Sequence, residues 1–249
     1  KASVLVVGYY KADITVKVGN TTKTVPATGG ENIITISNVT KGTNDVNVTY
    51  AGDDKYDSKT IVKTITVITS INSDENLKRG WDSPFDFEAE FLAKDGSVLQ
   101  NTEVKFEVNG KTYTVKTDSE GIARLTDAHL AVGTHEVKSI TPQTGEEKTR
   151  NVTIVKRILE NKDVTMDFAD GSSYKVKVIG DDGNPVGAGE FVAIKVNGIT
   201  YAAKTNSKGK ATFNLKKLTK KGKHTATITF AGDKFFNKVT KKVKLTVKK

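Results

Sequence analysis

The sequence predicts an all-β protein built from three tandem immunoglobulin-like β-sandwich domains arranged end to end. Two observations lead to this fold class: apolar and polar residues alternate along many short segments, and one series of motifs recurs three times in the 249 residues. Valine and threonine, which favour strands over helices, are frequent. With 21 glycines and four prolines, the composition is not that of a collagen-like or proline-rich segment.

Alternation with a period of two gives each expected strand one apolar and one polar face. In residues 173–178, Tyr174, Val176 and Val178 lie on one face and two lysines on the other. The same alternation occurs at 104–108, 226–230 and 243–247. Dipeptides that tolerate positive φ angles lie between such segments, namely Asp95-Gly96, Asn109-Gly110, Asp182-Gly183 and Asn197-Gly198. The pattern predicts a series of antiparallel hairpins.

The repeat emerges when the sequence is aligned with itself. Residues 108–113 (VNGKTY) return as 196–201 (VNGITY) with an offset of 88, and residues 48–53 (VTYAGD) return as 228–233 (ITFAGD) with an offset of 180. Three copies of one unit are therefore expected. Each copy ends on a strand-like segment followed by a short polar stretch, which places the boundaries near residues 68 and 156.

We expect three domains: a short first module of residues 1–68, a second module of 69–156 and a basic third module of 157–249. Units of this size with six or seven short strands fit a two-sheet immunoglobulin-like sandwich. The first module is the shortest, and it lacks a counterpart of residues 94–100. Because the linkers are short, the modules are expected to follow one another in series.

The composition excludes several kinds of chemistry. The chain has no cysteine, and therefore no disulfide, no thiolate nucleophile and no cysteine-ligated metal. It has no run of 18 apolar residues, so we expect no membrane insertion. The first residues lack the form of a cleavable signal, and we expect a fragment or a mature piece of a protein.

Catalytic motifs are absent from the sequence. The three histidines are His129, His135 and His224, and the last two occupy the same position of their modules, just after a turn. Nothing nearby supplies a nucleophile together with an orienting group. There is no Gly-x-Ser-x-Gly, no phosphate-binding glycine-rich loop and no His-Glu-x-x-His. We therefore expect a protein that is not an enzyme and that carries no cofactor.

Acidic residues cluster most closely in the first module. Asp53, Asp54 and Asp57 form a calcium candidate, since carboxylate oxygens are the ligands that calcium prefers. The third module has the same corner with less charge, Asp233 being followed by Asn237. The alternative is a solvated turn in which the aspartates accept hydrogen bonds from backbone N–H groups.

Positive charge is concentrated in the third module. Residues 157–249 contain 20 lysines and arginines against 8 aspartates and glutamates, a net charge of +12, whereas residues 1–156 contain 19 against 21. Five lysines in one loop form a candidate contact for an anionic polymer: Lys216, Lys217, Lys220, Lys221 and Lys223. No aromatic residues interleave with them, so we expect no nucleic acid partner. The alternative is that the lysines only solubilise the surface and protect strand edges.

Four sequons would permit N-glycosylation of an exported protein, at Asn20, Asn38, Asn47 and Asn151. Such sequons also arise by chance in a chain rich in asparagine and threonine.

The large aromatic residues at the start of the second module have two interpretations. Phe85, Phe87 and Phe91 share one period-two face, which predicts core positions rather than an exposed carbohydrate platform. Trp81 precedes them at a turn, and the sequence leaves its role open between capping the sandwich and packing against the first module.

Several motifs of the third module resemble a known family. These are residues 164–168 (VTMDF), 181–186 (DDGNPV) and 209–213 (GKATF), with the VNG hairpin described above. They are similar to the repeats of adhesin-like surface proteins of methanogenic archaea, which belong to the wider bacterial Ig-like (Big) family. The resemblance is strongest over 157–249, good over 69–156 and partial over 1–68. It implies an extracellular, cell-surface protein concerned with attachment to surfaces or partner cells.

Together these observations predict a non-enzymatic, adhesin-like fragment whose Ig-like modules form a stalk or spacer. The expected partner is a cell-surface or cell-wall polymer or a protein of a partner cell, and the chain itself is expected to be a monomer. Two alternatives stay open: a glycan- or cell-wall-polymer-binding module, and accessory repeats of a larger envelope enzyme.

Overall fold

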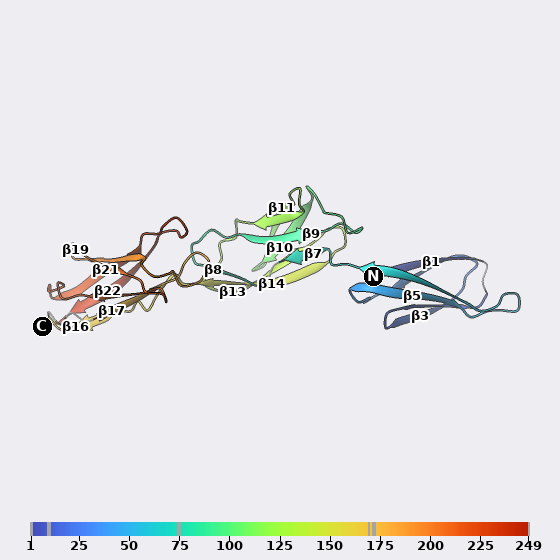
Figure 1. Cartoon of the computed structure of the whole chain (residues 1–249), viewed down its shortest axis with the longest axis horizontal. Helices are drawn as coiled ribbons and strands as arrows, with labels where there is room; N and C mark the ends of the chain where they lie inside the picture. The colour runs from blue at the N-terminus through green and yellow to red at the C-terminus, as the bar shows by residue number, and fades with distance from the viewer. Residues whose placement is uncertain (1, 9–10, 74–75, 169, 171–172, 249) are drawn as a thin grey trace. The chain divides into compact units, whose positions relative to one another are not determined.

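The computed structural model describes residues 2–8, 11–73, 76–168, 170 and 173–248. All regular secondary structure in these residues is β-strand, which confirms the all-β class. None of them forms a helix with the length and apolar character needed to cross a membrane. The chain divides into two compact units, Lys1–Ser70 and Ile71–Lys249, which are described separately (Figure 1).

The first unit is a sandwich of two antiparallel sheets. Its strands are β1 (Ala2–Gly8), β2 (Asp13–Val18), β3 (Thr21–Pro26), β4 (Gly30–Ile36), β5 (Gly42–Tyr50) and β6 (Lys59–Val67). One sheet has the order β3-β2-β5-β6 and the other pairs β1 with β4. Both sheets contribute to one apolar core, formed by Ile14, Val16, Val18, Ile34, Ile36 and Val46.

The second unit contains two further sandwiches. The strands of the first are β7 (Ile71–Ser73), β8 (Leu77–Gly80), β9 (Phe87–Phe91), β10 (Glu103–Val108), β11 (Lys111–Lys116), β12 (Ile122–Leu125), β13 (Gly133–Ile140) and β14 (Glu147–Val155). Those of the second are β15 (Ile158–Leu159), β16 (Val164–Met166), β17 (Ser173–Val178), β18 (Phe191–Val196), β19 (Ile199–Lys204), β20 (Lys210–Asn214), β21 (Gly222–Phe230) and β22 (Val239–Val247).

The two sandwiches of the second unit share one topology. Their five-stranded sheets have the orders β11-β10-β13-β14-β8 and β19-β18-β21-β22-β16, and their three-stranded sheets have the orders β12-β9-β7 and β20-β17-β15. In the first unit, β3-β2-β5-β6 and β1-β4 occupy the corresponding places, without counterparts of β7 and β8 among the residues described. The common strand order gives the sequence repeat a structural basis.

The predicted antiparallel hairpins are present, and two further pairings that the sequence pattern did not predict are parallel. The short strand β8 pairs in parallel with β14, and β16 pairs in parallel with β22. These two strands and the equally short β7 and β15 raise the number of described strands in each of these sandwiches to eight, above the six or seven expected. A strand of three or four residues carries too little alternation to be recognised from sequence.

Burial follows the predicted faces. Tyr174, Val176 and Val178 are all buried, as is the aromatic face of Phe85, Phe87 and Phe91. The rings of Phe87 and Phe106 meet edge to face, with centroids 5.7 Å apart, and join the two sheets of the sandwich. The second unit thus has two cores, one reaching Ile154 and the next beginning at Ile158. Because the two cores are separate, we propose that residues 69–156 and residues 157–249 form two modules.

The Asn-Gly dipeptides form the expected hairpin turns. Asn109 and Gly110 have φ angles of 51° and 75°, and Asn197 and Gly198 have 53° and 74°. Positive φ at both central residues matches the twist of the flanking strands and favours this dipeptide. The turns fix the register of β10 with β11 and of β18 with β19.

Candidate functional site

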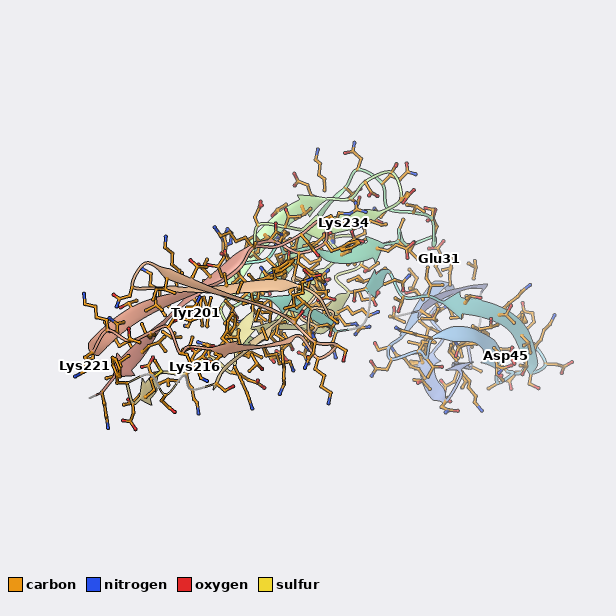
Figure 2. The ribbon with its side chains drawn as sticks, turned by 60° about the vertical axis from the view of Figure 1, so that its left-hand side comes forward. Glu31, Asp45, Tyr201, Lys216, Lys221 and Lys234 are labelled. Carbon is orange, nitrogen blue, oxygen red and sulfur yellow. The ribbon has the colours of Figure 1, made fainter. Side chains whose placement is uncertain are left out.

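The candidate polymer contact is residues 215–223, which we call the basic loop: the connection between β20 and β21 together with the first two residues of β21, Gly222 and Lys223. All five of its predicted lysines are exposed: Lys216, Lys217, Lys220, Lys221 and Lys223. Figure 2 labels Lys216 and Lys221 in the third module, where many side chains with nitrogen at their ends project from the ribbon. The structure therefore places the five side chains together on one short segment, as the sequence indicates.

Buried anchors hold the backbone of the basic loop. Leu215 and Leu218 are each 0% exposed, and the N–H of Leu218 donates to the carbonyl of Leu215 at 2.8 Å. The Nε2 of His224 donates to the carbonyl of Lys220 at 2.6 Å. Because the leucines and the histidine fix the backbone, the loop presents its ammonium groups from a defined scaffold. Such a group of like charges attracts anionic polymers at low ionic strength.

An aromatic side chain lies next to the basic loop. The Nζ of Lys221 is 5.9 Å from the ring centroid of Phe168, at the outer limit of a cation–π contact. Phe168 is 50% exposed and follows β16. The sequence pattern did not predict this contact, because 53 residues separate the two partners.

The acidic corner of the first module has the geometry of a hydrogen-bonded turn. Asp53 Oδ1 accepts the backbone N–H groups of Lys55 and Tyr56, at 2.8 and 2.9 Å. A hydrogen bond from the hydroxyl of Tyr50, together with these N–H groups, lowers the pKa of Asp53. Burial and the same carboxylate raise the pKa of Tyr50 to about 12. In the described part of the chain, no three acidic or histidine side chains converge as a metal site, at Asp54 and Asp57 or elsewhere.

The third module repeats this turn with different side chains. Asp233 Oδ1 accepts the N–H groups of Phe235 and Phe236 at 2.7 and 2.8 Å. Gly232, with φ of 79°, precedes it as Gly52, with φ of 90°, precedes Asp53. A Cβ on Gly232 would lie 2.5 Å from the carbonyl oxygen of Phe236, so the corner requires glycine.

The histidines have structural contacts. Nε2 of His135 donates to the carbonyl of Ala131 at 2.7 Å, four residues earlier, just as His224 does in the third module. The side chain of Asn109 also contacts His135 Nδ1. His129 is exposed on the loop between β12 and β13. The two equivalent imidazoles thus tie a loop to the strand that follows it.

The four sequon asparagines lie in different settings. Asn20, Asn38 and Asn151 are exposed, whereas Asn47 is half-buried in the middle of β5. Asn38 has a φ of 57° in the connection between β4 and β5. Accessibility therefore favours glycan attachment at the first three over Asn47.

Sequence reasoning missed the junction between the second and third modules. The side chain of Arg157 is 1% exposed, and its Nη2 lies 2.7 Å from Asp181 Oδ1 and 2.7 Å from the carbonyl oxygen of Asn237, to which it donates. Its Nε donates to the carbonyl of Ile179 at 3.2 Å. Burial lowers the pKa of Arg157, and the carboxylates of Asp181 and Asp82 oppose this effect.

The second module contacts this ion pair through its backbone. The N–H of Gly80, at the end of β8, donates to the carbonyl of Asp181 at 2.9 Å. A Cβ on Gly80 would lie 2.6 Å from the carbonyl oxygen of Gly180 and 2.8 Å from Cγ of Arg157. Across the same boundary, a Cβ on Gly183 would lie 2.7 Å from Cγ of Lys78. The two modules therefore approach each other to within backbone contact, at positions where only glycine fits.

No family model and no curated protein matches the chain. Solved structures resemble it at low identity. A Ca²⁺-stabilized adhesin with which an Antarctic bacterium reaches out and binds ice is 15% identical, over 99% of this chain and 69% of the other, with a TM-score of 0.29. A 1.5-MDa bacterial ice-binding adhesin is 14% identical over 99% and 91%, with a TM-score of 0.33.

A tandem segment of titin is 11% identical, over 99% of this chain and 93% of the other, with a TM-score of 0.32. At such values we base no ligand, partner or location of this chain on these three proteins.

Proposed function

We propose that the chain is a non-enzymatic stalk or spacer segment of an extracellular, adhesin-like cell-surface protein, and that it acts as a monomer. In this role, the successive sandwiches hold a binding part of the protein at a distance from the cell envelope. The sequence resemblance to surface repeats of methanogenic archaea supports the location. The repeated strand order supports a chain built by addition of like modules.

The junction at Arg157 is the observation that carries this proposal. A spacer needs neighbouring modules that keep their relative orientation, since a freely jointed chain folds back on itself. Here a buried arginine, its carboxylate partner and the N–H of Gly80 join the end of one sandwich to the start of the next. Ordering of this kind supports a fixed angle between the second and third modules.

Spin labelling tests the fixed angle, and the absence of native cysteine makes it direct. Thr112→Cys in the second module and Lys208→Cys in the third replace exposed residues. Pulsed electron–electron distance measurements on the full chain should give one narrow distribution, which Arg157→Ala broadens. A broad distribution in the parent protein would contradict the spacer function.

A second function, contact with an anionic cell-surface polymer, is supported by the basic loop. Five exposed lysines on a segment anchored by two buried leucines form a positive surface. The test is co-sedimentation of the full chain with purified cell walls at low and at high salt. Replacing the five lysines with glutamine should abolish binding.

A matched control removes the same charge elsewhere. Five other exposed lysines, replaced by glutamine, should leave wall binding intact: Lys41, Lys55, Lys59, Lys63 and Lys94. Binding that survives high salt and depends only on the basic loop would support specific recognition. Equal loss in both variants would show that only net charge matters and would contradict a dedicated contact.

A further inference from the structure

A pocket of about 550 Å³ opens at the end of the second module where β8 ends. Its floor includes the core side chains Phe85, Ala128 and Ile154, which are 8%, 2% and 5% exposed. Trp81 and His129 are exposed side chains of its wall. The pocket therefore combines an apolar floor with an exposed indole and polar groups, as small-molecule sites do.

The turn after β8 holds Trp81 at the pocket. Its N–H donates to the carbonyl of Val155 at 2.8 Å, and the N–H of Ser83 donates back to the carbonyl of Gly80 at 3.3 Å. Asp82, between them, has a φ of 59°. The backbone is thus fixed on both sides of the tryptophan, whose side chain is nevertheless 48% exposed. The ordered turn therefore presents a broad apolar ring face and a polar N–H at the pocket, both of which a ligand can contact.

Polar groups line the same pocket as Trp81. The hydroxyl oxygen of Ser83 is buried and has no hydrogen-bond partner among the described residues. Thr126 and His129 add an exposed hydroxyl and an exposed imidazole to the wall. A buried hydroxyl without a partner loses its hydrogen bonds to water, and a ligand that supplies one recovers this energy.

The third module has an equally exposed aromatic residue at the corresponding position. In the second module, His135 lies opposite Val152 on the neighbouring strand, and Val152 lies opposite Leu77 on the next. In the third module, His224 lies opposite Leu245, and Leu245 lies opposite Val164. Because the two histidines occupy the same place, Leu77 corresponds to Val164.

Four residues further along, Trp81 corresponds to Phe168. The ring of Phe168 has Lys221 of the chain's own basic loop against it, with Nζ 5.9 Å from the centroid. The counterpart in the second module, Trp81, instead borders an open pocket.

We propose that the pocket binds a neutral oligosaccharide, with one pyranose ring stacked on Trp81. The C–H face of a pyranose packs against an indole, while its hydroxyls both donate and accept hydrogen bonds, which suits Ser83, Thr126 and His129. Arg79 and Asp82 give the lining charges of both signs, so neither an anionic nor a cationic sugar is favoured. This activity goes beyond the spacer function and does not depend on it.

Trp81 is the only tryptophan of the chain, so its fluorescence reports directly on the pocket. The full chain is titrated with cellotetraose and, separately, with the tetramer of N-acetylglucosamine. We expect a saturable change of emission with at least one of them. Calorimetry with the same sugar then compares variants: Trp81→Ala should bind at least tenfold more weakly, and Phe168→Ala, the matched aromatic of the third module, should bind as the parent does.

Two results would overturn the proposal: no saturation with either sugar, or unchanged affinity in Trp81→Ala. Circular dichroism first checks that the variant is folded. If Trp81→Ala fails to fold, the double variant Thr126→Ala/His129→Ala, which changes exposed residues only, replaces it. Its affinity should fall severalfold, and an unchanged affinity would overturn the proposal as well.

Discussion

The guanidinium of Arg157 lies 2.7 Å from the carboxylate of Asp181, and the arginine side chain is 1% exposed while the aspartate is 17% exposed. Asn237 also donates to Asp181, from its backbone N–H at 3.0 Å and from its side-chain amide. This pair draws together a residue of the intermodule linker and two loops of the third module. A buried pair is costly to form, but removal of one partner leaves an unpaired buried charge.

Asp181→Asn should therefore lower the free energy of unfolding of the second unit by about 3 kcal/mol. Guanidinium unfolding of the full chain, followed by the fluorescence of Trp81 near this junction, measures the change. Lys138→Gln is the control, because Lys138 pairs with Glu147 at 3.1 Å on the exposed surface. The control should unfold at the parent's midpoint. A midpoint for Asp181→Asn equal to that of the control would show that the pair contributes no stability.

Gly80→Ala tests the close approach of the two modules. The added Cβ meets Gly180 and Arg157, and such overpacking costs about 1–3 kcal/mol. The control is Gly187→Ala, because no atom lies within 4 Å of a Cβ placed there. Thermal unfolding should show a lower melting temperature for Gly80→Ala alone. Equal melting temperatures of Gly80→Ala and Gly187→Ala would show that the atoms around Gly80 move aside without loss of stability, and would contradict a tight contact.

The turn at Asp118 predicts a specific acid sensitivity. Hydrogen bonds from the backbone N–H of Ile122 and from Arg124 lower the pKa of Asp118. Stability from this residue is thus present above its unfolded pKa of about 3.9 and is lost as pH falls through its lower folded pKa. At the same position the third module has Asn206, whose Oδ1 accepts the N–H groups of Lys208 and Lys210.

Asp118→Asn should keep the turn and reduce the loss of stability on acidification. Urea unfolding between pH 5 and about pH 2 compares the variant with the parent. The variant should be less stable than the parent at neutral pH, where Arg124 has lost a charged partner, and the difference should shrink in acid. Parallel pH profiles would contradict the assignment.

Tyr50 predicts the behaviour in alkali. Its pKa is raised to about 12 by burial and by Asp53, whereas an unfolded tyrosine ionises near pH 10. The stability that this shift provides is present below about pH 10 and is lost as pH rises through the folded value. Spectrophotometric titration compares the parent with Tyr50→Phe. In the native state the two proteins should show the same number of tyrosines ionising near pH 10. In the unfolded state the variant should show one fewer. Loss of a native step near pH 10 in that variant would contradict the shift.

Local sequence patterns predicted much of this fold. They could not predict contacts between residues that are distant in the sequence. The alternation of Tyr174, Val176 and Val178 and the turn at Asn109-Gly110 depend on neighbours in sequence, and both are confirmed. The five lysines of the basic loop are also close in sequence, and their contact with an anionic polymer stays a prediction. The ion pair of Arg157 joins residues 24 positions apart through loops whose path no periodicity describes.

The exposure of Trp81 was equally hidden from sequence. It depends on the parallel pairing of β8 with β14, since the N–H of Trp81 continues that ladder to Val155. The boundary near residue 68 stays a prediction, and the first compact unit of the chain ends at Ser70. Strand β7, which begins at Ile71, is too short to mark the start of the second unit by alternation.

The parallel pairing of β8 with β14 also determines how a module meets tension. The chain enters through the short strand β7, continues into β8 and leaves from β14. Once the three residues of β7 have separated from β9, a pull on the two ends drives the parallel strands β8 and β14 past each other in opposite directions. The hydrogen bonds from Leu77 to Gly80 are then loaded in shear and share the force, instead of opening one after another as in a zipper. The third module, through β16 and β22, has the same arrangement. We expect single-molecule stretching to show higher rupture forces for these two modules than for the first, where β6 ends the sheet next to β5 alone.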